Sequence, residues 1–320
     1  MFEGGEPNMK VMAIVQARMG SKRLPGKVLK PILGVPMLEL LLGRLSGAKH
    51  LNKIIVATTT DPSDVAIGML AAKLGVDCEF GSEENVLERY LIAAEKHHAD
   101  VIVRITGDCP LVDPELVDLV IEDFWAKDVD YVSNSMPTTF PDGLDVEVFS
   151  YSALLKSKKY ADTPYDLEHV TPKLREKPFS SNCLQNEENL SHLRWTVDEI
   201  GDLNVVCKVF SHFAPNIHFS WKKVLELNRT QPEIFTENLK IIRNEGAVMG
   251  SGQKLWKRAK SVIPGGNMLL SKRPEMFLPD HWPAYFSKSK GCEVWDLDNN
   301  HYIDMSIMGI GTNILGYGNE

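Results

Sequence analysis

The fold is decided by residues 12–31, MAIVQARMGSKRLPGKVLKP, in which an apolar strand runs directly into a loop rich in glycine and basic residues. Two glycines, Gly20 and Gly26, let backbone amides approach a bound anion closely because they carry no side chain. Four basic side chains can neutralise charge on phosphate oxygens, and they are Arg18, Lys22, Arg23 and Lys27. Their spacing fits neither the Walker loop nor the dinucleotide fingerprint. The stretch therefore predicts a polyphosphate site of another kind at the exit of a strand.

Apolar segments and helical patterns alternate along the first part of the chain. Strands are expected at residues 11–16, 53–58, 101–105 and 129–133, and helices at residues 36–47, 62–75, 84–98 and 114–126. This order favours an α/β fold in which helices cover both faces of a mostly parallel sheet. Ligands of such open sheets collect at the carboxyl ends of the strands. The loops 16–27 and 106–110 are both expected at that edge.

The later part of the chain is less regular. Residues 134–195 break into pieces punctuated by proline, which indicates an insertion that forms a substrate pocket or a subunit contact. A further strand and helix are expected between about 193 and 211, followed by amphipathic helices near 221–228 and 232–245. These helices are expected to close the α/β domain.

Three parts of the chain follow from this pattern. We expect an extension at residues 1–9, the α/β domain at residues 10–246 and a small helix and hairpin segment at residues 247–320. In the last part, the apolar residues of VWDLDNNHYID alternate around Asp298-Asn299-Asn300, which is typical of a hairpin turn.

Composition excludes several classes of protein. The 320 residues carry a formal net charge of -8, and this acidic balance argues against a general nucleic-acid binder. The five cysteines lack a CxxC spacing, so neither a disulfide framework nor a zinc site is indicated. No apolar run approaches the ~20 residues that span a bilayer. We therefore expect a cytoplasmic protein without a membrane or nucleic-acid partner.

The loop after the first strand resembles a known signature. The matching residues are Gln16, Arg18, Ser21, Arg23, Leu24, Pro25, Gly26 and Lys27. This pattern is similar to that of nucleotidyltransferases that activate acidic sugars with CTP, such as the CMP-Kdo and CMP-sialic acid synthetases, and above all to the spore-coat-polysaccharide type. The resemblance implies a Rossmann-like nucleotide-diphospho-sugar transferase fold. It also implies Mg²⁺-dependent transfer of CMP from CTP to an acidic or amino sugar, with release of pyrophosphate, for surface glycan biosynthesis.

The resemblance also assigns roles to residues of the phosphate loop and its surroundings. It implies that Lys27 binds near the α-phosphate and Arg18 near the departing pyrophosphate, and Lys22 and Lys30 are expected to be solvated. The segment GSEENVLERY resembles the part of the family that frames the nucleotide, with Ser82 expected to open a helix. The implied nucleotide-binding residues are Gln16, Ala17, Arg18, Ser21, Arg23, Lys27, Ser82, Arg89 and Arg104.

Two aspartates are implied as ligands of Mg²⁺, which prefers hard oxygen ligands. The GDxP motif of the family fits TGDCP and brings its metal-binding aspartate onto Asp108, which is also implied to be catalytic together with Arg18 and Lys27. The segment RWTVDEIGDL matches a second family aspartate at Asp198. Asp202 is expected to be a helix N-cap rather than a ligand.

The acceptor sugar is expected to bind residues of the insertion. In PDGLDVEVF, period-two alternation places Asp145 and Glu147 on one face of a short strand. They are candidates for binding acceptor hydroxyl or amino groups or for joining the metal shell, and the alternative is an exposed acidic edge strand. In DLEHVTP, Glu168 and His169 are further acceptor candidates, although His169 has the alternative of capping and packing.

A second resemblance lies in the C-terminal part. The runs SGQKLWKRAKSVIPGG and GCEVWDLDNNHYIDMSIMGIGTNILGYGNE resemble the amino-terminal segment of class III aminotransferases of the glutamate-semialdehyde aminomutase type. The catalytic lysine and phosphate-binding loop of that family are expected beyond residue 320. We therefore expect a truncated module without a functional pyridoxal-phosphate site.

Other functions stay open on the sequence alone. One is nucleotidyl transfer from GTP or UTP, or transfer to a phosphorylated acceptor, because a fold resemblance does not select the substrate. The other is an inactive scaffold module of an aminotransferase fusion. A homodimer through residues 134–180 is also expected, and the sequence names neither the base nor the acceptor.

Overall fold

The computed structural model describes residues 9–239, 241, 251–266, 273–276 and 282–304. It divides the chain into two compact units, Met1–Lys240 and Ile241–Glu320. The expected extension falls almost wholly outside the described residues, and so does the expected domain boundary at 246–247.

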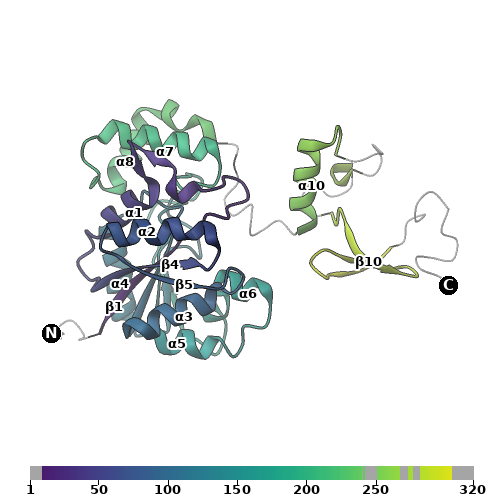
Figure 1. Cartoon of the computed structure of the whole chain (residues 1–320), viewed down its shortest axis with the longest axis horizontal. Coiled ribbons are helices and arrows are strands. Elements are labelled where there is room, and N and C mark those ends of the chain that lie inside the picture. Colours follow the sequence, from purple (N-terminus) through teal and green to yellow (C-terminus); the bar gives the residue numbers. More distant parts are fainter. Residues whose placement is uncertain (1–8, 240, 242–250, 267–272, 277–281, 305–320) are drawn as a thin grey trace. The chain divides into compact units, whose positions relative to one another are not determined.

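A mixed sheet forms the centre of the first unit (Figure 1). Its strands are β5 (Asp77–Gly81), β4 (Lys53–Thr59), β1 (Val11–Gln16), β6 (Val101–Thr106), β8 (Glu147–Ser150), β7 (Tyr131–Ser133) and β9 (Ser181–Cys183), in that order. The first four are parallel, β8 is antiparallel to β6 and β7, and β9 is parallel to β7. Gln16 is level with Ala57 and Thr106, so β1, β4 and β6 end at one edge. A small ribbon, β2 (Pro31–Ile32) with β3 (Val35–Pro36), follows the loop after β1.

Helices cover both faces of this sheet, as Figure 1 shows. One face packs against α1 (Met37–Leu45), α2 (Val65–Lys73), α4 (Pro114–Lys127), α7 (Ile200–Phe213) and α8 (Trp221–Thr230). The other packs against α3 (Val86–His97) and α5 (Tyr151–Ser157). Within β1, Val11, Ala13 and Val15 face the first set, whereas Met12 and Ile14 face the second. Burial on both faces explains why β1 is apolar throughout, and each buried Val or Ile stabilises the fold by roughly 1.5–3 kcal/mol.

Shorter elements complete the first unit. The 3-10 turns are η1 (Lys27–Leu29), η2 (Pro62–Asp64), η3 (Pro172–Arg175) and η4 (Pro232–Asn238), and α6 (Pro164–His169) precedes η3. None of the helices among the described residues has the length and apolar character needed to cross a membrane.

The expected α/β class, with its alternating strands and helices, is confirmed. The strand expected near residue 193 is wrong, because Arg194 makes only an isolated bridge to Asp142. The helix expected at 232–245 is the 3-10 turn η4, and residues 240 and 242–245 lie outside the described residues. β5, β9 and the β2–β3 ribbon were not expected, since these strands are short or carry polar residues, so that pairing with neighbours defines them. β8 falls in the short strand expected around Asp145 and Glu147.

The second unit contains α10 (Ser251–Val262), η6 (Pro274–Met276) and a three-stranded antiparallel sheet. Its strands are β10 (Phe286–Lys290), β11 (Glu293–Asp296) and β12 (His301–Ile303). The Asp296 carboxylate accepts hydrogen bonds from the backbone N of Asp298 and of Asn300, each at 2.9 Å. This turn confirms the expected hairpin, whereas the last part of the aminotransferase-like run, residues 305–320, is not described.

Asp113 ties the start of α4 to the start of α8. Its buried carboxylate caps α4 through the backbone N of Glu115 at 2.9 Å and of Leu116 at 3.1 Å, and it also accepts a hydrogen bond from the N of Trp221 at 2.6 Å. Asp61 caps η2 in the same way but is exposed.

We predict that Asp113→Ala lowers the free energy of unfolding by about 2–4 kcal/mol, since it removes a cap and leaves the buried N–H of Trp221 unpaired. Asp61→Ala is the matched control and is expected to cost about 1 kcal/mol or less. Urea unfolding followed by circular dichroism measures both. Equal losses in the two variants would contradict the linking role of Asp113.

Candidate active site

The phosphate loop, residues 17–26, is held at the carboxyl edge of the sheet by backbone hydrogen bonds. Ala17 N donates to Ala57 O at 3.1 Å, and Gly107 N donates to Gln16 O at 2.8 Å. A Cβ at Gly107 would lie 2.8 Å from Gln16 O, so this approach of two loops requires glycine. Gly26 has φ 68°, a left-handed conformation that glycine adopts without strain, and it starts η1.

Asp64 holds this loop against the end of β4, and it was not among the residues predicted from the sequence. Its buried carboxylate accepts hydrogen bonds from Met19 N at 2.7 Å, Thr59 N at 3.1 Å and Thr59 Oγ1 at 2.6 Å. Thr58 Oγ1 donates to the same carboxylate at 3.0 Å. The side chain therefore joins the end of β4 to the loop after β1. In sequence, Asp64 looks like an ordinary polar residue at the start of a helix, which hides this role.

Lys27 lies between the two aspartates implied as metal ligands. Its Nζ donates to Asp108 Oδ2 at 2.8 Å, to Asp198 Oδ1 at 2.9 Å and to the carbonyl oxygen of Val197 at 2.8 Å. Asp108 follows β6, and its own carbonyl accepts a hydrogen bond from Val197 N at 2.8 Å. Asp108 and Asp198, which are 81 and 171 positions from Lys27 in the sequence, thus both contact its ammonium group.

The charges of this group stabilise one another. Burial acts to raise the pKa of Asp108, but the Lys27 ammonium outweighs it and holds that pKa below its ordinary value. Burial acts to lower the pKa of Lys27, but Asp108 and Asp198 outweigh it and raise that pKa. Lys27 is therefore a cation and Asp108 an anion at neutral pH.

Asp198 has two further cationic partners. Its Oδ2 lies 2.8 Å from Arg23 Nη2 and 2.9 Å from Arg194 Nη2. Arg194 also donates to Asp142 Oδ2 at 2.8 Å and to Asp202 Oδ1 at 2.9 Å. Arg194 begins the segment RWTVDEIGDL, yet it was assigned no role from the sequence; in the structure it fixes the segment that carries Asp198.

Asp202 differs from its expected role. The N-cap of α7 is Glu199, and Asp202 is the third helical residue of a capping box. Its carboxylate accepts hydrogen bonds from the N of Asp198 at 2.9 Å and of Glu199 at 3.0 Å, and it is fully buried. It therefore orients the backbone at Asp198.

The donor set around Lys27 Nζ fits a magnesium ion. Two carboxylate oxygens and one carbonyl oxygen surround a point at which a cation already lies. Mg²⁺ usually takes one or two protein carboxylates and completes its shell with water and phosphate oxygens. No group of three or more His, Cys, Asp or Glu residues suited to a metal occurs among the described residues, so this pair of carboxylates is the place to test.

Arg18 pairs with acids other than Asp108 and Asp198. Its Nη1 is 3.1 Å from Glu83 Oε1, and its Nη2 is 4.0 Å from Glu168 Oε1. Through Glu168, Arg18 connects the phosphate loop with the insertion.

Gln16 and Ser21, which are also implied nucleotide residues, make contacts within the protein. Gln16 accepts a hydrogen bond from Tyr90 Oη at 3.3 Å, and Ser21 Oγ accepts one from Leu24 N at 3.4 Å.

Two other implied nucleotide residues lie on α3 or before it. Arg89 is 3% exposed, and its Nε and Nη1 have no hydrogen-bond partner among the described residues. Burial lowers its pKa. Ser82 does not open α3, because Asn85 is the N-cap and Ser82 Oγ accepts a hydrogen bond from Asn85 N at 3.1 Å in the preceding turn.

A buried ion cluster joins β6 and β8 to η3, and β8 and η3 both lie in residues 134–195, the expected insertion. Glu147 Oε1 accepts hydrogen bonds from Tyr131 Oη at 2.7 Å, Thr171 Oγ1 at 2.8 Å and Arg175 Nη2 at 2.6 Å. Its Oε2 pairs with Arg104. Burial acts to raise the pKa of Glu147, but Arg104 and Arg175 outweigh it and lower that pKa to about 2. Both oxygens of Glu147 are thus occupied by protein donors.

The other acceptor candidates lie around this cluster. Asp145 precedes β8 and does not belong to the strand, so the expected shared strand face with Glu147 is wrong. Burial and then the charges of Asp108 and Asp145 raise the pKa of the Cys109 thiol. His169 ends α6, and its ring contacts that of Tyr165 at 4.3 Å between centroids.

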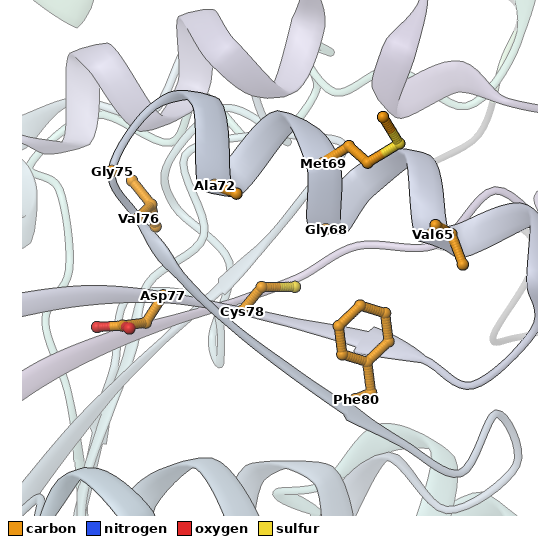
Figure 2. Close-up of a pocket in the computed structure, with 9 residues that line it drawn as sticks. All are labelled: Val65, Gly68, Met69, Ala72, Gly75, Val76, Asp77, Cys78 and Phe80. Atoms are coloured by element: carbon orange, nitrogen blue, oxygen red, sulfur yellow. The ribbon is translucent and has the colours of Figure 1, made fainter.

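A surface hollow between α2 and β5 contains none of the implied site residues. Val65, Gly68, Met69, Cys78 and Phe80 are among the residues that line it (Figure 2). Its lining is largely apolar and lies at the outer edge of the sheet. The charged residue among those that line it is Asp77, so it offers no cation for a phosphate.

Comparison with known proteins decides the family. The sequence profile described as Cytidylyltransferase matches residues 12–202, more than half of the chain. The chain belongs to the cytidylyltransferase family. An uncharacterised protein of Methanocaldococcus jannaschii is 40% identical over 230 residues, which are 71% of this chain and 93% of that protein. The spore coat polysaccharide biosynthesis protein SpsF of Bacillus subtilis is 31% identical over 238 residues, 71% of this chain and 97% of that protein.

A solved structure agrees with this assignment. A cytidylyltransferase of Leptospira borgpetersenii superposes with a TM-score of 0.70 at 35% identity, covering 73% of this chain and 100% of that chain. The chain is therefore a nucleotidyltransferase, and its family membership disfavours the scaffold alternative. The family match ends at residue 202, so the aminotransferase resemblance of residues 247–320 stays a prediction.

We predict that Asp64→Asn raises the KM for the nucleotide about tenfold with a smaller change in kcat, because an amide cannot accept all the hydrogen bonds that hold the loop. The exposed variant Asp61→Asn, three residues earlier, is the matched control and is expected to keep the KM. Steady-state kinetics separates the two parameters. A fall in kcat at constant KM would contradict a role in holding the loop.

Glu147 provides a prediction on pH. Its pKa is about 2 in the folded protein against an ordinary 4.5, so its stabilising contribution is complete above pH 4.5 and is lost as the pH falls toward 2. We expect Glu147→Gln to cost about 3 kcal/mol at pH 7 and much less near pH 3. Urea unfolding at both pH values tests this, with the exposed Glu168→Gln as control. A loss that does not depend on pH would refute it.

Proposed function

We propose that this cytidylyltransferase transfers CMP from CTP to an acidic or amino sugar and releases pyrophosphate, in the biosynthesis of a surface glycan. The observation that carries the proposal is the meeting of Lys27, Asp108 and Asp198 at the exit of β1, beside a glycine-containing basic loop. The family match supports the nucleotide, and the name of the Bacillus subtilis relative supports a polysaccharide pathway.

In this proposal Asp108 and Asp198 hold Mg²⁺, which when bound neutralises charge on the phosphates and on the departing pyrophosphate. Lys27 and Arg23 adjoin the same carboxylates and would bind phosphate oxygens directly. Arg18 would bind the pyrophosphate end. Guanidinium groups suit this task because their planar donors match phosphate oxygens in pairs.

The nucleotide side of the site has an available donor in Arg89. A buried guanidinium with two nitrogen atoms unpaired among the described residues is costly, and a bound nucleotide would satisfy it. Backbone groups of Gln16 and Ala17 and the side chains of Ser21 and Ser82 complete the proposed nucleotide set.

The acceptor side is proposed to lie at the insertion. The cluster of Glu147 with Arg104 and Arg175 holds one more positive than negative charge, which suits an acidic sugar. Val170, between α6 and η3, has φ 68° and is buried, a strained conformation for a β-branched residue. Backbone strain of this kind persists where the surrounding structure fixes it, and it is common at binding sites. The neighbours of Val170 in sequence are the acceptor candidates Glu168 and His169, and Thr171. Glu168, His169 and Asp145 are the proposed acceptor contacts.

A panel of CTP, GTP, UTP and ATP, with pyrophosphate release as readout, tests the nucleotide. We expect strong preference for CTP with a suitable acceptor. We also expect Asp108→Asn to lower kcat/KM at least about a hundredfold, since the Mg²⁺ that neutralises the phosphate charge would lose one of its two carboxylates. Lys22→Met removes a neighbouring loop charge and is expected to change activity little. Preference for GTP or UTP would refute the proposed substrate.

The expected homodimer and the cytoplasmic location stay predictions. Light scattering of the purified chain measures the first, and a monomeric mass would contradict it.

A further inference from the structure

The position of Lys27 Nζ has a consequence for metal binding. The ammonium lies 2.8 Å from Asp108 Oδ2, 2.9 Å from Asp198 Oδ1 and 2.8 Å from Val197 O. Magnesium binds oxygen at about 2.0–2.1 Å, which is shorter than these distances. An ion bound to Asp108 Oδ2 and Asp198 Oδ1 would have to occupy the space that the ammonium fills. Lys27 and a divalent cation therefore exclude each other between Asp108 and Asp198.

The other cations of the site do not conflict with a metal in this way. Arg23 and Arg194 contact Oδ2 of Asp198, whereas Lys27 contacts Oδ1. Arg194 is further fixed by Asp142 and Asp202. These ion pairs can persist while the Oδ1 side of Asp198 changes its partner.

Lys27 has the freedom to leave these carboxylates, although its side chain is mostly buried. It carries its charge on a flexible four-carbon stem, and it follows Gly26 at the start of a single 3-10 turn. An anion bound to the adjoining loop, which is proposed to bind phosphate, would replace the partners that the ammonium loses.

We propose that the Lys27 ammonium is a resident counter-ion of Asp108 and Asp198 in the nucleotide-free protein, and that a divalent cation binds these carboxylates only by displacing it. The lysine keeps the two carboxylates paired and lowers their affinity for metal until substrate arrives. The displaced ammonium is then free to bind a phosphate oxygen, a step that rests on the proposed function.

Binding of Mn²⁺ to the full chain without nucleotide tests the exchange, with the electron paramagnetic resonance signal of free Mn²⁺ as readout. Removal of the competitor in Lys27→Met is expected to tighten binding about tenfold or more. Lys22→Met, which removes an equal charge from the same loop, is expected to stay within about twofold of the unchanged protein, because loop charge alone acts weakly on an exposed ion. Adding Asp198→Asn to Lys27→Met is expected to abolish the gain.

Unchanged or weaker Mn²⁺ binding in Lys27→Met would overturn the exchange, and so would an equal gain in Lys22→Met. Lys27→Gln, which retains an N–H donor without charge, is a second variant should Lys27→Met unfold. If both variants fold only with Mn²⁺, the metal replaces the lysine as proposed; if Mn²⁺ restores neither, the exchange is wrong. No nucleotide is present, so a failure of CMP transfer leaves this result intact and is recognised separately.

Discussion

The ion group of Lys27, Asp108 and Asp198 is the constraint on which the site depends. It joins the loop after β1, the loop after β6 and the segment before α7, which are far apart in sequence. Opposite charges attract more strongly in a partly buried setting than in water, and a buried charge left without a partner is costly. Each of the three segments is therefore held in place by the other two. A site built in this way positions its charges before substrate arrives.

Supporting contacts make that position rigid. Asp64 holds the phosphate loop against the end of β4, and Asp202 with Arg194 orients the backbone at Asp198. On the insertion side, Glu147 links β8 to η3 through Arg175. These carboxylates are all buried and accept several hydrogen bonds each, so their geometry is well defined. The catalytic chemistry proposed for the cytidylyltransferase thus depends on acids that do not themselves touch the substrate.

The loop after β1, the TGDCP loop and Asp198 were predicted from the sequence, because each follows an apolar strand or lies in a segment that matches a family motif. Prediction from the sequence failed where the decisive information was a partner far along the chain. Asp64 carries no local pattern that separates it from ordinary surface residues, and Arg194, although it begins the segment RWTVDEIGDL, was assigned no role. Glu147 was predicted to bind the acceptor, whereas both of its oxygens bind protein groups. The strand expected near Arg194 failed for the same reason, since its polar contacts and not a ladder fix that segment.

The sequence by itself determined the α/β class, the order of the strands β1, β4 and β6 with their helices, and the basic loop that follows β1. These features are local, since apolar periodicity and helix-start residues act over a few positions. Only the tertiary structure decided which acids meet Lys27, which are locked in structural ion pairs and which anchor the loop. Those contacts join residues separated by tens to more than a hundred positions, and they are fixed by the packing of the whole sheet and its helices.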